Sequence, residues 1–266
     1  MLVENTLFGI VDKVQIALDD LRRYEPPEGY YVCFSGGKDS VVILDLVKRA
    51  GVKYDAHHAI MTIEPPELMK FIYKEYPDVI QEHPPTTMHK LILKYGCLPL
   101  RKFRYCCWRL KSDNKGNNRF KVLGCRREES PRRAKYKKVE IERKQLNLII
   151  DWTTKDVWEY IHKYNVKYCK LYDEGRSRIG CVFCCMAKRS QLLDDLKKYP
   201  QYAKYLITAC DRAIKTRLAQ GKESKYKTGE EMFFKTYFSD DDKKADDNSL
   251  TLDCFGENEK DLLELR

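Results

Sequence analysis

The sequence has no apolar stretch long enough to cross a membrane. Its best apolar run, residues 41–47, is interrupted by Asp45, whereas a membrane span needs about 20 apolar residues. The first residues also lack the basic region followed by an apolar one that marks a secretory signal. We therefore expect a cytoplasmic protein with no membrane partner.

Neither disorder nor a disulfide-stapled fold fits the composition. Of the 266 residues, 43% are hydrophobic and 34% are charged, which is too apolar for a disordered chain and too polar for a membrane bundle. The length allows one large domain, or one domain with a smaller appended unit. There is no internal repeat, so a solenoid is excluded.

Positive charge is concentrated in one segment. The chain carries a formal charge of +10. Residues 101–144 contain 17 Lys and Arg against 5 Asp and Glu, or +12, and the other 222 residues sum to −2. Such a segment indicates a polyanionic ligand, either nucleotide phosphates or nucleic acid. The alternative is a solvated basic surface, which is the better interpretation for Lys135, Lys137 and Lys138.

The first part of the chain alternates between strand and helix patterns. Short apolar runs predict strands at 30–34, 54–61, 78–81, 120–124 and 147–150, and helical spacing predicts helices at 7–21, 41–50, 67–76, 88–95 and 154–161. Strands separated by helices imply an α/β fold with a doubly wound, mainly parallel sheet.

The pattern becomes purely helical after residue 190. Helices are predicted at 191–198, 202–220 and 230–237, followed by an acid-rich linker at 239–248. We therefore predict a nucleotide-binding domain with a cysteine motif at 1–190, and a helical C-terminal extension with a polar tail at 191–266.

The most informative string is Ser35-Gly-Gly-Lys-Asp-Ser40, which lies between a predicted strand and a predicted helix. Backbone N–H groups and the helix dipole gather around an anion at such a junction. Gly36 and Gly37 let the backbone approach the phosphates closely, and Ser35 and Ser40 add hydroxyl donors. Lys38 neutralises the charge of the phosphates and is expected to face solvent when no ligand is bound. Asp39 is suited to hold Mg²⁺ or to order the loop. The spacing is not that of a Walker A loop.

This string resembles the PP-loop of the ATP pyrophosphatase superfamily, which has an adenine nucleotide alpha hydrolase-like fold. The chain further resembles the phosphoadenosine phosphosulfate (PAPS) reductase-like family over about residues 28–190. Besides the loop, the resemblance is carried by Thr62-Ile-Glu-Pro-Pro-Glu67, Arg104-Tyr-Cys-Cys-Trp-Arg-Leu-Lys111, Gly124-Cys-Arg-Arg-Glu-Glu-Ser130, Asp151-Trp152 with Asp156-Val-Trp158, and Leu171-Tyr-Asp-Glu-Gly175 leading to Arg178-Ile-Gly-Cys-Val-Phe-Cys184.

The resemblance implies a second wall of the nucleotide site. It would be formed by Gly124, Arg126, Ser130 and Arg133, with Arg126 also counted as catalytic beside Lys38 and Asp39. The arginines follow a predicted strand end, from which a guanidinium can fork onto phosphate or sulfate. Solvent-facing charge is the alternative for each of them.

Five of the eleven cysteines are clustered in sequence, as Cys106-Cys107 and Cys181-x-x-Cys184-Cys185. Clustered thiols in a reducing compartment indicate metal or redox chemistry. The order resembles the [4Fe-4S] ligands of adenosine phosphosulfate (APS) reductases, which implies Cys106, Cys107, Cys181 and Cys184 as ligands. Zn²⁺ is the alternative metal, Cys169 or Cys185 are alternative ligands, and Cys33 and Cys210 are expected to be inert.

Two departures from the reductases favour ATP as substrate. The reductases typically have a degenerate loop, whereas this one is complete. They also carry a nucleophilic cysteine in a C-terminal Glu-Cys-Gly-Leu/Ile-His string, whereas this chain has Leu252-Asp-Cys-Phe-Gly256 with no histidine after it. We therefore expect ATP-dependent adenylation coupled to sulfur transfer, as in relatives that modify DNA backbones or tRNA bases.

Several partners and two other functions remain open. The sulfur donor would be a protein such as a cysteine desulfurase, and the +12 segment supports a nucleic-acid acceptor. The first alternative is an APS or PAPS reductase that uses a thioredoxin-like reductant. The second is a non-catalytic nucleic-acid-binding protein with a structural metal.

Overall fold

The computed structural model describes residues 1–7, 9–112, 116 and 118–239. The predicted polar tail and Cys254 lie outside these residues. Two units each pack mainly within themselves: unit 1 comprises Met1–Ile60, Glu64–His83 and Asn114–Gly180, and unit 2 comprises Met61–Ile63, Pro84–Asp113 and Cys181–Arg266. The sequence predicts a domain boundary at residue 190. These discontinuous units do not test whether an independent domain ends there, so that boundary stays a prediction.

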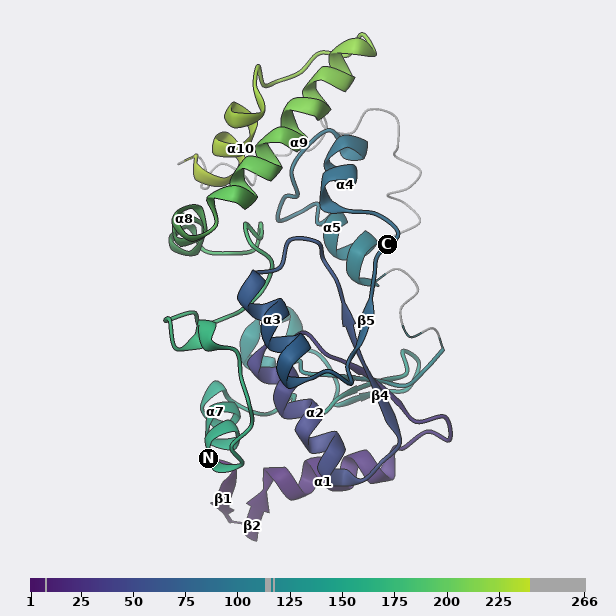
Figure 1. Ribbon diagram of the computed structural model, residues 1–266. Helices are drawn as coiled ribbons and strands as arrows, with labels where there is room; N and C mark the ends of the chain where they lie inside the picture. Colours follow the sequence, from purple (N-terminus) through teal and green to yellow (C-terminus); the bar gives the residue numbers. More distant parts are fainter. Residues whose placement is uncertain (8, 113–115, 117, 240–266) are drawn as a thin grey trace. The chain divides into compact units, whose positions relative to one another are not determined.

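Unit 1 is built on a six-stranded sheet with the order β5-β4-β3-β6-β8-β7; its strands β4 and β5 are labelled in Figure 1. Five strands run parallel and β7 pairs antiparallel at the edge. The strands are β3 (Tyr30–Cys33), β4 (Tyr54–Ala59), β5 (Ile80–Glu82), β6 (Lys121–Leu123), β7 (Val139–Glu140) and β8 (Gln145–Asn147). The predicted mainly parallel α/β sheet is confirmed.

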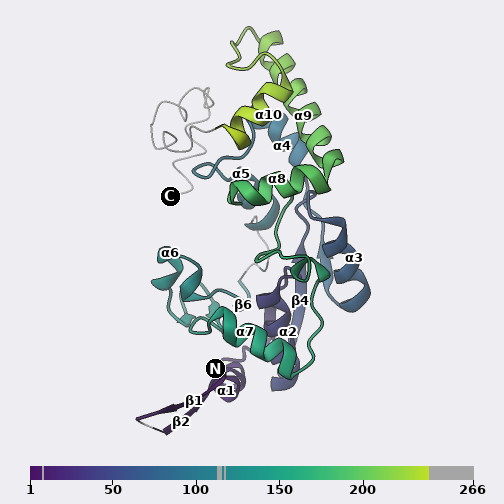
Figure 2. The same cartoon turned by 90° about the vertical axis from the view of Figure 1, so that its left-hand side faces the viewer.

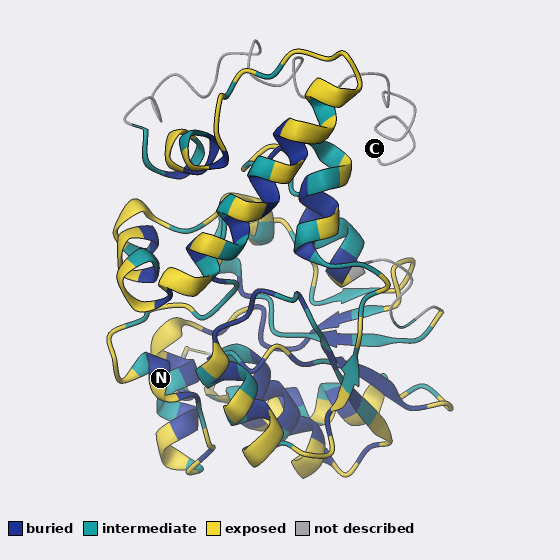
Figure 3. Ribbon diagram, turned by 45° about the horizontal axis from the view of Figure 1, so that its top comes forward, coloured by how far each residue is buried: buried dark blue, intermediate teal, exposed yellow. Residues whose placement is uncertain are grey.

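The apolar core of unit 1 lies between this sheet and its helices. These are α1 (Lys13–Arg23), α2 (Lys38–Ala50), α3 (Pro66–Glu75) and α7 (Thr154–Lys163). Tyr30, Val32 and Phe34 are alternate residues, so they share one face of the sheet, and all three are buried in the core. The helix α2 is buried along most of its length (Figure 3), which fixes the position of its first turn.

Two predicted elements of unit 1 are wrong at their bounds. The predicted helix 7–21 begins as a hairpin of β1 (Val3–Thr6) and β2 (Gly9–Asp12), because Asp12 caps the helix by accepting from the N–H groups of Val14 and Gln15. The predicted strand 147–150 is mostly a buried turn, in which the Ile150 N–H donates to the Asn147 carbonyl. Its apolar run reflects burial rather than strand pairing.

Unit 2 is helical. It contains α4 (Met88–Tyr95), α5 (Tyr105–Cys107) continued by a π-helical turn at Trp108–Ser112, α8 (Arg189–Lys198), α9 (Pro200–Ala219) and α10 (Gly229–Phe238). The long helix α9 packs against both α4 and α10 (Figure 2), and its buried positions form one side of a second apolar core. The predicted helical C-terminal part is confirmed. Within the described residues, no helix is both long and apolar enough to traverse a membrane.

Candidate functional site

The Ser35–Ser40 loop connects the carboxyl end of β3 to the first turn of α2. Gly37 is the N-cap residue of that helix, so the N-cap residue supplies no capping side chain. The Lys38 N–H at the start of the helix instead donates to the Tyr172 hydroxyl at 2.8 Å, and the backbone donors of such a first turn can serve an anion. The carboxyl edge of a parallel sheet is also where α/β folds bind their ligands.

Gly36 is required by both its conformation and its packing. Its φ is +70°, a backbone angle that residues with a side chain rarely adopt. A Cβ at this position would also lie 2.7 Å from Leu68 and 2.9 Å from Ile72 of α3. The loop therefore packs directly on α3. No other residue type combines this backbone angle with this contact.

The sequence predicts that Lys38 faces solvent, but the structure places it in the interior. It is only 6% exposed, its Nζ donates to the Ser177 carbonyl at 3.3 Å, and Asp39 Oδ2 lies 3.4 Å away. The first turn of a buried helix leaves the ammonium inside the site, where a carbonyl and a carboxylate replace its water. The Lys38 ammonium thus lies beside the backbone N–H groups of the first turn of α2 without needing a ligand to bring it there.

The two serines of the loop face each other. Ser35 Oγ donates to Ser40 Oγ at 3.2 Å, and Ser40 Oγ donates to the Gly37 carbonyl at 2.8 Å. These contacts shape the loop from within. Their role as direct nucleotide ligands stays a prediction.

Gly124 brings the end of β6 against the first turn of α2. A Cβ at Gly124 would lie 3.1 Å from the Asp39 Cβ and 3.2 Å from the Asp39 carbonyl carbon. This is tighter than ordinary side-chain contacts, so only glycine lets the two segments approach this closely without displacement. The predicted second wall therefore meets the loop at Asp39.

Arg126 is bound by carboxylates and does not project from the wall. It is 2% exposed, its Nε donates to Asp39 Oδ1 at 2.6 Å, and its Nη1 pairs with Glu128 and donates to Thr154 Oγ1 at 3.1 Å. Burial lowers the pKa of this guanidinium, but Asp39 and Glu128 outweigh burial and hold it above the ordinary value. Arg126 therefore orders Asp39, which supports the loop-ordering role of that carboxylate; its Mg²⁺ role stays a prediction.

Ser130 and Arg133 are held by local structure. Ser130 caps the short helix α6 (Pro131–Ala134) by accepting from the Arg133 N–H at 3.3 Å, and the Arg133 guanidinium pairs with Glu129. The side chain of Arg133 is still about one-third exposed, so an anion can reach it. Of the predicted wall, it is the arginine open to a ligand from solvent.

Five cysteines of unit 2 lie within electrostatic range of one another, namely Cys106, Cys107, Cys181, Cys184 and Cys185. The Cys106 thiol donates to the Cys107 sulfur over 4.0 Å, which lowers the pKa of Cys107 to about 7. The same hydrogen bond, with burial, raises the pKa of Cys106. Charge interactions connect this pair to Cys181, Cys184 and Cys185. The lowered pKa brings Cys107 closer than Cys106 or Cys185 to the thiolate form that binds metals.

The C-terminal helices support the CxxC turn. Phe183, inside the turn, has a φ of +54°, and its N–H donates to the buried Asp195 carboxylate of α8 at 3.0 Å. Its ring contacts Phe233 of α10 edge to face, with centroids 5.1 Å apart. These contacts give residues beyond 190 a structural role at the thiols that sequence reasoning leaves open.

The donor type fits a sulfur-bound metal. Even so, no three or more His, Cys, Asp or Glu side chains of the described residues are arranged to hold a metal ion. The [4Fe-4S] cluster and the Zn²⁺ alternative both stay predictions. Cys169 lies in the core of unit 1 and is fully buried, and burial raises its pKa, as expected of a structural thiol.

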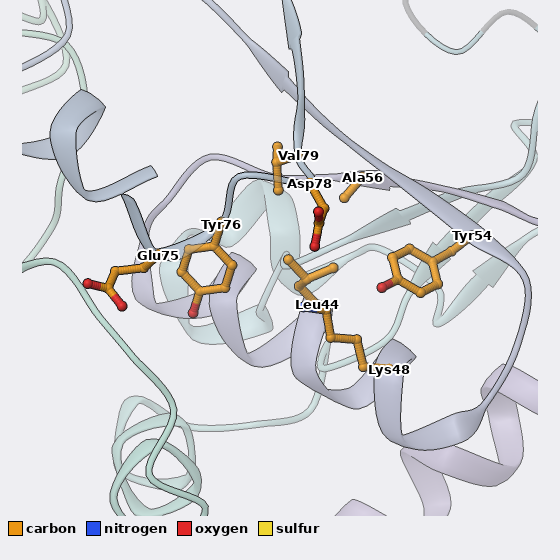
Figure 4. Close-up of a pocket in the computed structure, with 8 residues that line it drawn as sticks. All are labelled: Leu44, Lys48, Tyr54, Ala56, Glu75, Tyr76, Asp78 and Val79. Carbon is orange, nitrogen blue, oxygen red and sulfur yellow. The ribbon is translucent and has the colours of Figure 1, made fainter. Parts of the chain in front are cut away.

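A shallow pocket lies away from the loop, around the later turns of α2 and the start of β4 (Figure 4). It is lined by Leu44, Lys48, Tyr54, Ala56, Glu75, Tyr76, Asp78 and Val79. None of these belongs to the predicted nucleotide site. The pocket marks the amino end of β4, opposite to the edge where the loop emerges.

Sequence reasoning missed two residues that contact the site. Tyr172 accepts from the Lys38 N–H at 2.8 Å, and Glu128 pairs with Arg126. Tyr172 lies within one of the strings that carry the resemblance, directly before Asp173, so its motif was visible although its role was not. Glu128 could not be separated from its neighbour Glu129 by sequence alone.

Several known proteins are similar to this chain. An adenosine 5'-phosphosulfate reductase of Anoxybacillus flavithermus is 40% identical over 67 residues, covering 24% of this chain and 28% of that protein. The corresponding reductase of Lysinibacillus sphaericus is 28% identical over 188 residues, covering 63% and 76%. An uncharacterized protein of Methanocaldococcus jannaschii is 28% identical over 71% of this chain. The chain spans 43% of that protein, so it matches less than half the length of two of these relatives.

A solved structure and a family model are also similar to this chain. The PAPS reductase of Candida auris, in a phosphate complex, aligns with a TM-score of 0.47 and 18% identity over 62% of this chain and 87% of that one. Residues 29–187, which include the loop, the second wall and both cysteine groups, match the model of the phosphoadenosine phosphosulfate reductase domain. The chain belongs to this family.

Proposed function

We propose that the chain binds an adenine nucleotide at the Ser35–Ser40 loop and breaks the anhydride bond next to its adenylate group. The observation that carries the proposal is the buried Lys38 ammonium at the N-terminus of α2, a helix whose N-cap glycine supplies no capping side chain. A preformed cation and a helix N-terminus together favour a polyphosphate or a sulfate-phosphate anhydride. Membership of the family supports an adenylyl substrate.

The residues of unit 1 divide this work. Lys38 and the N–H groups of the first helical turn stabilise the charge that develops on the leaving group. Asp39 is fixed by Arg126, which acts through it and is therefore a positioning residue. Arg133 supplies a second, more accessible cation for the anion.

Two substrates fit this scheme. With ATP, an acceptor oxygen attacks the α-phosphorus, the α–β anhydride breaks and pyrophosphate leaves. With APS or PAPS, a thiolate attacks the sulfur, the adenylate nucleotide leaves, and a thioredoxin-like reductant supplies the two electrons that release sulfite. The names of the relatives favour the reductase, whereas the complete loop and the absence of a Glu-Cys-Gly-Leu/Ile-His string favour ATP.

Sulfur transfer would complete the reaction with ATP. The terminal sulfur of a donor persulfide, such as that of a cysteine desulfurase, would attack the activated acceptor and release AMP. A thiol reductant would then supply two electrons to cleave the resulting disulfide, which frees the donor cysteine and leaves the sulfur on the acceptor. The +12 segment supports a nucleic-acid acceptor. Cys106, Cys107, Cys181 and Cys184 would hold the [4Fe-4S] cluster, whose chemistry is electron and sulfur handling. Two observations support this assignment: these thiols interact with one another, and the pKa of Cys107 is lowered.

A product assay tests the proposal. The anaerobically purified chain is incubated with ATP and Mg²⁺, with APS, or with PAPS, and the products are separated by ion exchange. Release of pyrophosphate and AMP supports ATP use, and release of sulfite with an adenosine nucleotide supports the reductase. Salt-dependent binding of DNA or RNA with no product in any incubation overturns both and favours the non-catalytic protein.

Replacing Cys184 with alanine is expected to abolish metal binding. Loss of one thiolate opens the ligand set, and metal binding contributes directly to folding. We expect Cys184→Ala to lose its iron and the absorbance near ~400 nm that an iron–sulfur cluster gives, as measured by iron analysis and spectroscopy of anaerobic protein. The matched control is Cys210→Ala, a buried thiol of α9, which should keep the full metal content.

The same experiment tests the alternative ligands. Full iron in Cys184→Ala, with loss in Cys185→Ala or Cys169→Ala, would reassign the fourth ligand. Zinc in place of iron in the wild-type chain would replace the cluster by the Zn²⁺ alternative.

A further inference from the structure

The phenolic oxygen of Tyr172 takes up a backbone donor of the Ser35–Ser40 loop. The Lys38 N–H, in the first turn of α2, donates to it at 2.8 Å. Tyr172 is the last residue of the 3₁₀ turn Lys170–Tyr172. A backbone N–H at the start of a helix is a donor that proteins use for an anionic oxygen.

The same segment also engages the lysine side chain. Lys38 Nζ donates to the Ser177 carbonyl at 3.3 Å and lies 5.6 Å from the centre of the Tyr172 ring. Residues 172–179 thus satisfy both the backbone and the side-chain donors of Lys38. These are the groups that the proposed function assigns to the nucleotide.

The tyrosine is a weak occupant of this position. Burial raises the pKa of Tyr172 well above its ordinary value, although hydrogen bonding from the backbone opposes the shift. The phenol is therefore protonated, and its oxygen neutral, at neutral pH. A hydrogen bond to an ionised oxygen is roughly twice as strong as one between neutral groups. A phosphate or sulfate oxygen therefore outcompetes the hydroxyl for the same donor.

We propose that Tyr172 is a positioning residue of the nucleotide site, whose hydroxyl holds the place of a phosphate or sulfate oxygen in the empty loop and is displaced when the nucleotide binds. The hydroxyl keeps the Lys38 N–H aligned while no nucleotide is bound. This inference rests on the proposed function, because it concerns the same loop.

The structure provides both a reporter and a matched control. Trp158 contacts the Tyr172 ring edge to face at 5.2 Å, and it contacts Tyr168 with the same geometry at 5.2 Å. The Tyr168 hydroxyl donates to Asp173 on the surface. Tyr168→Phe therefore removes a hydroxyl beside the same tryptophan without altering the donors at Lys38.

The test measures binding of pyrophosphate, ATP and APS by calorimetry and by tryptophan fluorescence. Tyr172→Phe leaves the Lys38 N–H without its acceptor when no ligand is bound, so we expect the ligand that wild type binds to bind this variant about fivefold more tightly. Tyr168→Phe should bind as wild type does. Ligand should also change the fluorescence of wild type, and Trp158→Phe should remove that change.

The outcomes separate the two proposals. If wild type binds a ligand and Tyr172→Phe binds it equally or more weakly, the displacement is wrong and the nucleotide site stands. A ligand that binds without a Trp158-dependent signal also overturns the displacement and leaves the nucleotide site in place. If neither wild type nor Tyr172→Phe binds any of the three ligands, the proposed function fails and the inference fails with it.

Discussion

Lys38→Met is expected to lower nucleotide turnover by about 100-fold or more while the chain stays folded. The ammonium is the cation nearest the first turn of α2, and loss of one preorganised donor to a developing charge costs a factor of this size. Methionine keeps the apolar stem that the buried position requires. Turnover is measured as release of pyrophosphate or sulfite, and folding is measured by circular dichroism.

Lys48→Met is the control for this prediction. It places the same substitution on the same helix, at an exposed position in the last turn, and should leave turnover unchanged. If Lys38→Met retains wild-type turnover with ATP and with APS, the loop lysine has no part in the reaction and the proposed site is wrong.

Arg126→Met is expected to lower the free energy of unfolding by about 1–3 kcal/mol. The substitution leaves the partly exposed Asp39 and Glu128 carboxylates without the buried cation that both contact, and removing one partner of a charged hydrogen bond in the folded state has a cost of this size. The position of Asp39 is then lost, so turnover should fall as well. Urea unfolding followed by circular dichroism measures the effect on stability.

Arg133→Met is the control for Arg126→Met, because it removes a partly exposed arginine of the same basic segment instead of a buried one. Arg133 pairs with Glu129 and is one-third exposed, so its replacement should cost at most about 1 kcal/mol. Equal unfolding midpoints for the two variants would show that the Arg126 network does not stabilise unit 1.

The sheet and the loop were predictable because their signals are local. A buried strand needs consecutive apolar residues, as at Tyr30–Cys33, and a phosphate loop needs glycines next to a helix start, as at Gly36 and Gly37. The hairpin before α1 was not predictable in this way, because the apolar residues at 10 and 11 match helical spacing equally well. The Asp12 cap decided between the two.

The role of each charged residue depended on neighbours that are distant in sequence. In a basic segment Arg126 has the pattern of a phosphate ligand, but Asp39 lies 87 positions away and takes its Nε. Lys38 has the pattern of a solvent-facing residue, but Ser177 lies 139 positions away and accepts from its Nζ. Such partners are brought together only when the strands of a parallel sheet align their carboxyl ends.

The sequence by itself determined the family, the alternating α/β order, the glycine-containing loop at Ser35–Ser40 between strand and helix, and the two cysteine groups. Each of these depends on residue types at fixed spacing along the chain. Only the tertiary structure decided that Lys38 is buried, that Arg126 orders Asp39, that Tyr172 accepts from the Lys38 N–H and that α8 and α10 contact the CxxC turn. The physical reason is that burial and hydrogen-bond partners are set by packing between segments, which the spacing of residues along one segment does not specify.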